Sequence, residues 1–198
     1  MDRSLLALGA VAIVFVAIGS CSSPRIISEE KLSNYADDYS VEDGEAFLRK
    51  GIYYHYEMEN IPEAINYCLK AKVIFEKYSP SKLSSCLHEL GILYEDVGQY
   101  SKAIECNLRG IDIDRTLGNT EDVSGKLGNL AICYSSLGDN SKAITCLKEA
   151  MGLDKQMDDP LQLCIKWNNL AHIYLEEEQF DDSLKYFNKI MEVMEKNR

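Results

Sequence analysis

Apolar and small residues recur along the chain at one fixed interval. The clearest series consists of Tyr54, Tyr94, Tyr134 and Tyr174, which defines a 40-residue period. A small residue stands three positions before each tyrosine, and Lys102-Ala103-Ile104 recurs one period later as Lys142-Ala143-Ile144. Several series that share one period indicate stacked copies of one structural unit.

Within each period the spacing predicts two helices that pack against each other. The last copy reads Trp167-x-x-Leu170-Ala171-x-x-Tyr174, and Ser183-x-x-x-Phe187 follows it. Small residues such as Ala171 allow two helices to cross closely, while the large residues beside them fill the remaining space. The pairs Gly98-Gln99 and Gly138-Asp139 are typical of turns and separate the two helices of a unit. The pattern predicts an all-α protein.

This pattern resembles the signature of the tetratricopeptide repeat, with Trp, Leu, Gly or Ala, and Tyr on a first helix and Ala and Phe on a second. The resemblance implies a right-handed superhelical solenoid of about four helix-turn-helix units. The predicted units are 43–78, 83–117, 122–157 and 161–196. The step from Gly51 to Ala64 is one position longer than the step from Gly91 to Ala103, so we expect one extra residue in the first turn, near Met58 to Asn60.

The 40-residue form of the repeat resembles those of kinesin light chains and of bacterial peptide-sensing regulators. Both families bind segments of other proteins in the concave groove, which the first helices line. The sixth position of the motif is occupied by Arg49, Glu89, Asn129 and Asn169. An Asn amide offers both a donor and an acceptor to a peptide backbone, so the resemblance implies ligand contacts at Asn129 and Asn169. The alternative is an exposed Asn without a partner.

Arg49 and Glu89 interrupt the series of Asn residues, which weakens the case for a groove in the first half of the chain. Arg49 could bind a ligand carboxylate, but a pair with Glu45 or Glu89 is favoured. The other positions that correspond to the groove of the family are Tyr56, Ser85, His88, Glu95, Ser135, Asn168 and His172.

Composition and charge narrow the function. The chain has 46% hydrophobic and 27% charged residues, a composition that is typical of a globular protein. Its net charge of −11 disfavours binding to nucleic acid, because the phosphate backbone is also negative. No phosphate-binding loop and no catalytic constellation is found, so we expect neither an enzyme nor a cofactor. The three His residues fall in separate units, too far apart for a metal site, although they could form a pH-responsive set. Six cysteines are predicted to be buried free thiols rather than disulfides: Cys68, Cys86, Cys106, Cys133, Cys146 and Cys164.

The N-terminus differs in kind from the rest of the chain. A continuous apolar run, Leu5 to Ile18, is typical of a signal peptide, with an uncleaved anchor as the alternative. Ile18-Gly19-Ser20-Cys21 resembles a bacterial lipobox, which implies a signal peptide over 1–20 and a lipid on Cys21. Residues 21–42 would then form a tether and a short cap helix from Ser28. Ser22 follows the cysteine, which favours the outer over the inner membrane.

The last predicted helix carries two apolar stripes, more than one packing contact requires. We expect Leu184, Phe187, Met191 and Met194 to face the partner helix of the same unit. A second stripe, Tyr186, Ile190 and Val193, would then be covered by another subunit, by a partner or by a further domain. The alternative is a merely exposed patch.

These features together predict a non-catalytic module that binds a protein or peptide and is tethered to a bacterial membrane as a lipoprotein. Two alternatives stay open. One is a structural assembly factor for outer-membrane or pilus complexes, and the other is the sensor part of a signalling regulator.

Overall fold

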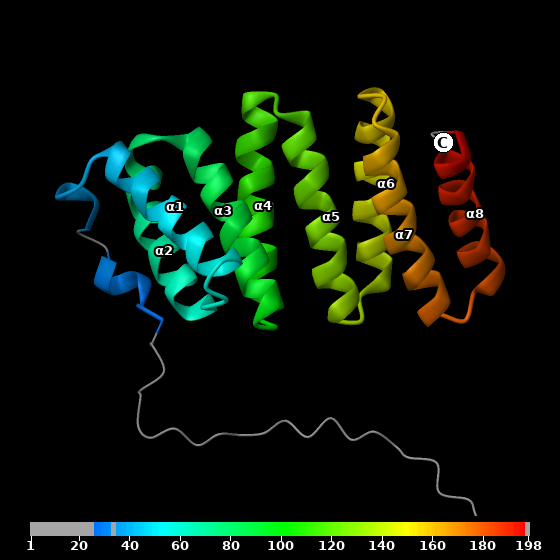
Figure 1. Ribbon diagram of the computed structural model, residues 1–198, viewed down its shortest axis with the longest axis horizontal. Helices are drawn as coiled ribbons and strands as arrows, with labels where there is room; N and C mark the ends of the chain where they lie inside the picture. The colour runs from blue at the N-terminus through cyan, green and yellow to red at the C-terminus, as the bar shows by residue number, and fades with distance from the viewer. Residues whose placement is uncertain (1–25, 33–34, 197–198) are drawn as a thin grey trace, which may run out of the picture.

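The computed structural model describes residues 26–32 and 35–196, and its regular structure there is entirely helical. Eight α-helices stand in a row from α1 to α8 and form four antiparallel pairs, so the predicted all-α solenoid of four helix-turn-helix units is confirmed (Figure 1). The helices are α1 Val41–Tyr56, α2 Ile61–Tyr78, α3 Pro80–Asp96, α4 Tyr100–Leu117, α5 Thr120–Ser136, α6 Asn140–Gln156, α7 Pro160–Glu176 and α8 Phe180–Lys196.

Local sequence sets where the helices begin and end. The Ser40 hydroxyl accepts a hydrogen bond from the Asp43 amide, and the Asp43 side chain accepts one from Ser40 in return, so α1 begins with a capping box. Gly98 and Gly138 adopt φ of 70° and 78° in the turns that follow α3 and α5, a conformation that glycine tolerates without strain. The link between α1 and α2 spans residues 57–60, one residue longer than 97–99 in the second unit.

Small residues lie where the two helices of a unit cross. A Cβ at Gly51 would come within 2.5 Å of the Cys68 sulfur, and one at Gly91 within 3.0 Å of the Asn107 amide. In the last unit the Ser183 hydroxyl donates to the carbonyl of Ala171 at 2.8 Å. Close crossing therefore lets the large apolar residues pack into buried clusters along the row of helices.

Two buried ion pairs join successive units. Lys126 of α5 donates to Asp114 of α4 at 2.7 Å, and Lys166 of α7 lies 3.7 Å from Asp154 of α6. All four side chains are at most 3% exposed. The Ser124 hydroxyl also donates to Asp154. Ions buried this deeply require their partners, because an unpaired charge in the interior is strongly destabilising.

The N-terminal segment covers the first unit. The predicted cap segment contains two short 3-10 helices, η1 Glu29–Leu32 and η2 Tyr35–Asp37, which pack against α2. Leu32 and Ala36 are buried there, and the amide of Ile27 donates to the side chain of Asn66 at 2.7 Å. The chain itself therefore covers part of this end of the row, along α2.

The predicted signal peptide and Cys21 lie outside the described residues. Within 26–32 and 35–196, no helix combines the length and the apolar character needed to cross a membrane.

The orientation of α8 corrects one expectation. Of the four residues expected to face α7, Phe187 is half-buried and its ring lies edge-on to His172 of α7 at 5.9 Å, but Leu184, Met191 and Met194 are more than half exposed. Tyr186, Ile190 and Val193, which were expected to form the outer edge, are half-buried, and Tyr186 stacks on Tyr174 of α7 at 5.8 Å. The buried Ser183, whose hydroxyl donates to the carbonyl of Ala171 in α7, lies on the same side of the helix as these three residues.

Candidate functional site

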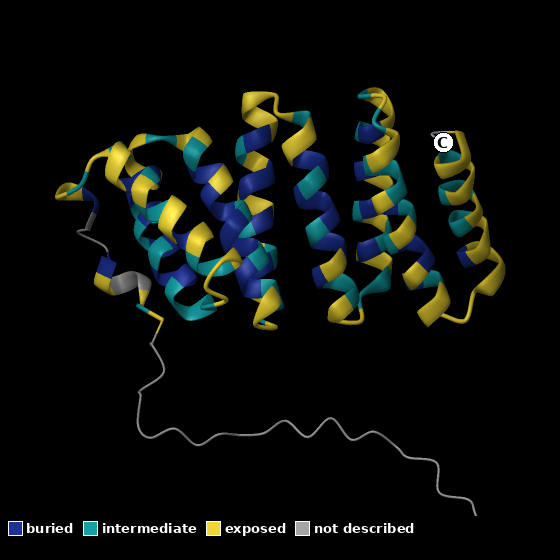
Figure 2. Cartoon of the chain, in the orientation of Figure 1, coloured by how far each residue is buried: buried dark blue, intermediate teal, exposed yellow. Residues whose placement is uncertain are grey.

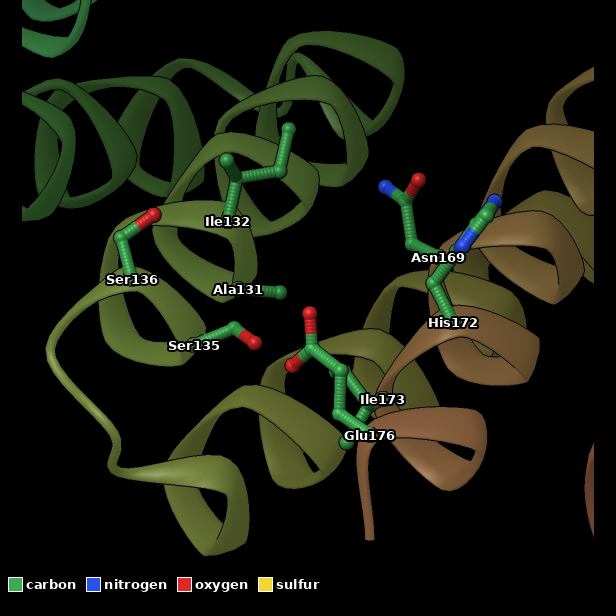
Figure 3. Close-up of a pocket in the computed structure, with 8 residues that line it drawn as sticks. All are labelled: Ala131, Ile132, Ser135, Ser136, Asn169, His172, Ile173 and Glu176. Atoms are coloured by element: carbon green, nitrogen blue, oxygen red, sulfur yellow. The ribbon is translucent and has the colours of Figure 1, made fainter. Parts of the chain in front are cut away.

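A cavity of about 330 Å³ lies between the first helices of units 3 and 4. Three predicted groove residues, Ser135 of α5 and Asn169 and His172 of α7, line it from both sides (Figure 3). Ala131, Ile132 and Ile173 add apolar surface, and Ser136 and Glu176 add polar groups. The cavity thus combines an apolar wall with a few polar groups, as pockets that hold a ligand commonly do.

Asn129 of α5 lies one unit before Asn169 of α7, at the equivalent position of the repeat. Its side chain is only partly exposed, and its Nδ2 is buried with no hydrogen-bond partner among the described residues. A buried amide donor without an acceptor is destabilising by about 1–3 kcal/mol.

The corresponding surface of units 1 and 2 is occupied by side chains of the protein itself. His55 of α1 reaches across to α3, where its Nδ1 lies 2.8 Å from a Glu89 oxygen and its Nε2 lies 2.8 Å from an Asp96 oxygen. Glu89, expected to contact a ligand, is instead buried and held by this contact. The open part of the surface is therefore the half formed by α5 and α7.

Burial perturbs two further predicted residues of α3, His88 and Glu95. Burial lowers the pKa of the His88 imidazole, and the ammonium of Lys126 lowers it further. Burial raises the pKa of the Glu95 carboxyl, and the negative charge of Asp96 raises it further. Glu95 also accepts a weak hydrogen bond from the Cys133 thiol at 3.9 Å. Both groups thus favour their neutral forms more than an exposed side chain would.

The other predicted groove residues are exposed and do not line the cavity. Arg49 pairs with Glu45 at 3.5 Å, as favoured from the sequence. Tyr56 lies against the ring of His55 at 4.2 Å and is 59% exposed. Ser85 and Asn168 are exposed on α3 and α7. The structure therefore brings together only part of the predicted set.

Sequence reasoning missed Ser136 and Glu176. Both occupy the same position of the repeat as Tyr56, a predicted groove residue. The repeat period therefore could have identified them as groove residues. Among the residues the structure describes, no group of three His, Cys, Asp or Glu side chains could hold a metal ion. The six cysteines named above are free thiols.

Comparison with known families agrees with this geometry. Family models described as tetratricopeptide repeat match residues 84–117, 127–161 and 167–197, which make up about half of the chain. The chain belongs to the tetratricopeptide repeat family, whose members are generally protein-interaction modules. No curated protein matches the sequence.

Several solved structures share the fold. The apo form of RapI is 23% identical with a TM-score of 0.74, and the match covers 85% of this chain and 61% of RapI. Aspartyl phosphate phosphatase F from Bacillus subtilis is 20% identical with a TM-score of 0.72, over 85% of this chain and 44% of its own. Kinesin light chain-like repeats from Podosopora anserina are 14% identical with a TM-score of 0.61, over 86% and 94%. The chain thus spans less than two thirds of the first two proteins.

Proposed function

We propose that this protein binds an extended segment of another polypeptide along the surface formed by α5 and α7, and that it does so without catalysis. The observation that carries the proposal is the cavity between these helices, because three of the expected groove residues, Ser135, Asn169 and His172, meet in it. A cavity of about 330 Å³ is at the lower end of the range for small ligands, which suits one or two side chains of a peptide.

Asn129 and Asn169 would form hydrogen bonds with the backbone of the bound peptide. A peptide offers one N–H and one C=O per residue, and an amide side chain can pair with both. Because these contacts involve the ligand backbone, they give affinity for many sequences. Ile132 and Ile173 would select an apolar side chain, and Glu176 would favour a neighbouring positive charge.

The protein is also proposed to be held at a bacterial membrane through a lipid on Cys21. The support for this tether is the sequence Ile18-Gly19-Ser20-Cys21 after an apolar run. Labelling cells with a fatty-acid probe should modify the wild-type protein and not Cys21→Ala. Equal labelling of both proteins would overturn the tether and leave the groove untouched.

The groove is tested with a random peptide library selected on the immobilised full chain. Peptides that are recovered should bind the wild type, and Asn129→Ala/Asn169→Ala should weaken them at least tenfold by fluorescence anisotropy. Gln156→Ala removes an exposed amide at the end of α6, away from the groove, and should leave affinity unchanged. Equal binding by the double variant would refute the proposed groove.

The alternatives are an assembly factor that uses convex surfaces and edges, or the sensor part of a signalling regulator. The likeness in fold to RapI and to aspartyl phosphate phosphatase F supports the regulator, since the chain corresponds to only part of each. An assembly factor would retain its partner when both asparagines are replaced. A DNA-binding or kinase domain encoded next to this chain would support the regulator.

A further inference from the structure

Among residues 26–32 and 35–196, none covers the outer face of α8 as the following helices cover α4 and α6. Ile111 of α4 and Met151 of α6 are 2% and 9% exposed, because α5 and α7 respectively pack over them. Met191, at the same position of α8, is 55% exposed. Figure 2 shows the same contrast, with mostly exposed residues along α8 where α4 and α6 carry buried ones.

The chemistry of this face differs from that of the interior junctions. Asp114 and Asp154 occupy the position that Met194 occupies in α8, and each of them pairs with a buried lysine of the next unit. A following repeat with such a lysine would bury it without a partner against Met194, which is unfavourable. With Leu184 and Met191, this residue forms an apolar surface that fits another apolar helix face.

The opposite end of a second molecule does not fit. In α1 the positions that correspond to Val123, Lys126 and Leu130 are Asp43, Ala46 and Lys50, and none of the three is buried. Asp43 is engaged in the cap of its own helix. Stacking units head to tail would therefore press charged groups onto the apolar face, which disfavours a filament.

A second α8 in the antiparallel direction does fit. Asp181, Lys185, Glu192 and Lys196 lie along one flank of the apolar stripe, because at 100° per residue they fall within a single arc of the helix. Their charges alternate along the flank. Antiparallel pairing that sets Lys185 against Glu192 of the second copy also sets Asp181 against Lys196 of the second copy, and two-fold symmetry repeats both pairs.

We propose that this protein forms a two-fold symmetric dimer through antiparallel packing of α8 on α8, with Leu184, Met191 and Met194 at the centre. Both concave surfaces stay free in this arrangement, because the contact uses the end of the row and not α5 or α7. A dimer with two grooves would bind a ligand that carries two recognition segments more tightly than a monomer could.

Sedimentation velocity on the full chain tests the dimer. The wild type should show a concentration-dependent species of twice 22.4 kDa. Met191→Asp should weaken association at least tenfold, whereas Leu108→Asp, which changes a 45%-exposed residue of α4, should not. Circular dichroism and thermal unfolding verify that each variant is folded. A wild type that stays monomeric at all concentrations overturns the proposal.

A charge exchange tests the antiparallel register. Lys185→Glu places two carboxylates together at each end of the contact and should weaken association about tenfold. Lys185→Glu/Glu192→Lys restores opposite charges and should recover the wild-type affinity. If the double variant stays as weak as the single one, Lys185 and Glu192 do not meet and the proposed packing is wrong.

Discussion

Equivalent helices form the junction between units 1 and 2 and the junction between units 2 and 3. The first junction is apolar, whereas the second contains a buried ion pair. In the first, the positions equivalent to Asp114 and Lys126 are Phe75 and Cys86, both fully buried in one apolar cluster. In the second, the same two positions carry a buried ion pair. The same backbone geometry therefore tolerates either solution, and the side chains decide how strongly each junction depends on an exact partner.

The largest effect is expected at the ion-paired junction. Lys126→Met should destabilise the fold by about 3–5 kcal/mol, because Asp114 stays buried without its cation. Urea unfolding measures the loss. Asp114→Leu/Lys126→Met should recover most of it by converting this junction to the apolar type, and a double variant as unstable as the single one would contradict that view.

A smaller effect is expected at the junction between units 3 and 4. Lys166→Met should destabilise by about 1–3 kcal/mol, because Asp154 keeps its hydrogen bond from Ser124 and its pair distance is already 3.7 Å. Burial lowers the pKa of Lys166, although Asp154 opposes this shift. The two lysine variants are compared in one urea series, and a larger loss for Lys166→Met would reverse the order proposed here.

The first two junctions also differ in the room next to the position of Lys126. A Cβ at Gly110 would come within 2.6 Å of the Lys126 side chain, whereas the first junction has Ala71 at the equivalent position. Gly110→Ala should destabilise by about 1–3 kcal/mol through overpacking. Gly125→Ala adds a methyl group in open space on the next helix and should stabilise by up to about 1 kcal/mol. Thermal unfolding of both variants tests whether the two changes in stability have opposite signs.

The smallest effect is expected for the dependence of folding stability on pH. Since the pKa of His88 is lowered from 6.5 in the folded state, the unfolded chain takes up a proton first as the pH falls. The histidine therefore reduces stability below about pH 6.5 and has no effect well above it. His88→Gln should lose part of this acid destabilisation between about pH 7.5 and 5.5 in urea unfolding. The exposed His172→Gln is the control, and equal pH dependence in wild type and His88→Gln would refute the expectation.

Residues that obey the repeat period could be predicted, including the small crossing residues and the cavity residues Asn169 and His172. The period also contained signals that were overlooked. Asp114 and Asp154 are one period apart, and so are Lys126 and Lys166, yet the pairs appear only when two successive units are stacked. Ser183, which donates a hydrogen bond to α7, stands at the same position as Ala103 and Ala143.

Contacts outside the period could not be predicted in this way. His55 meets Glu89 and Asp96, which are 34 and 41 residues away, and no repeat spacing singles out that combination. The closed first half of the groove follows from this contact.

The sequence alone determined the helical class, the number of units and the turns, because these depend on local conformation and on a packing pattern that each unit repeats. The tertiary structure decided which polar groups find a partner among the described residues, and which stripe of α8 faces outward. Those outcomes depend on the distances between side chains of different units. The rotation from one helix pair to the next sets these distances.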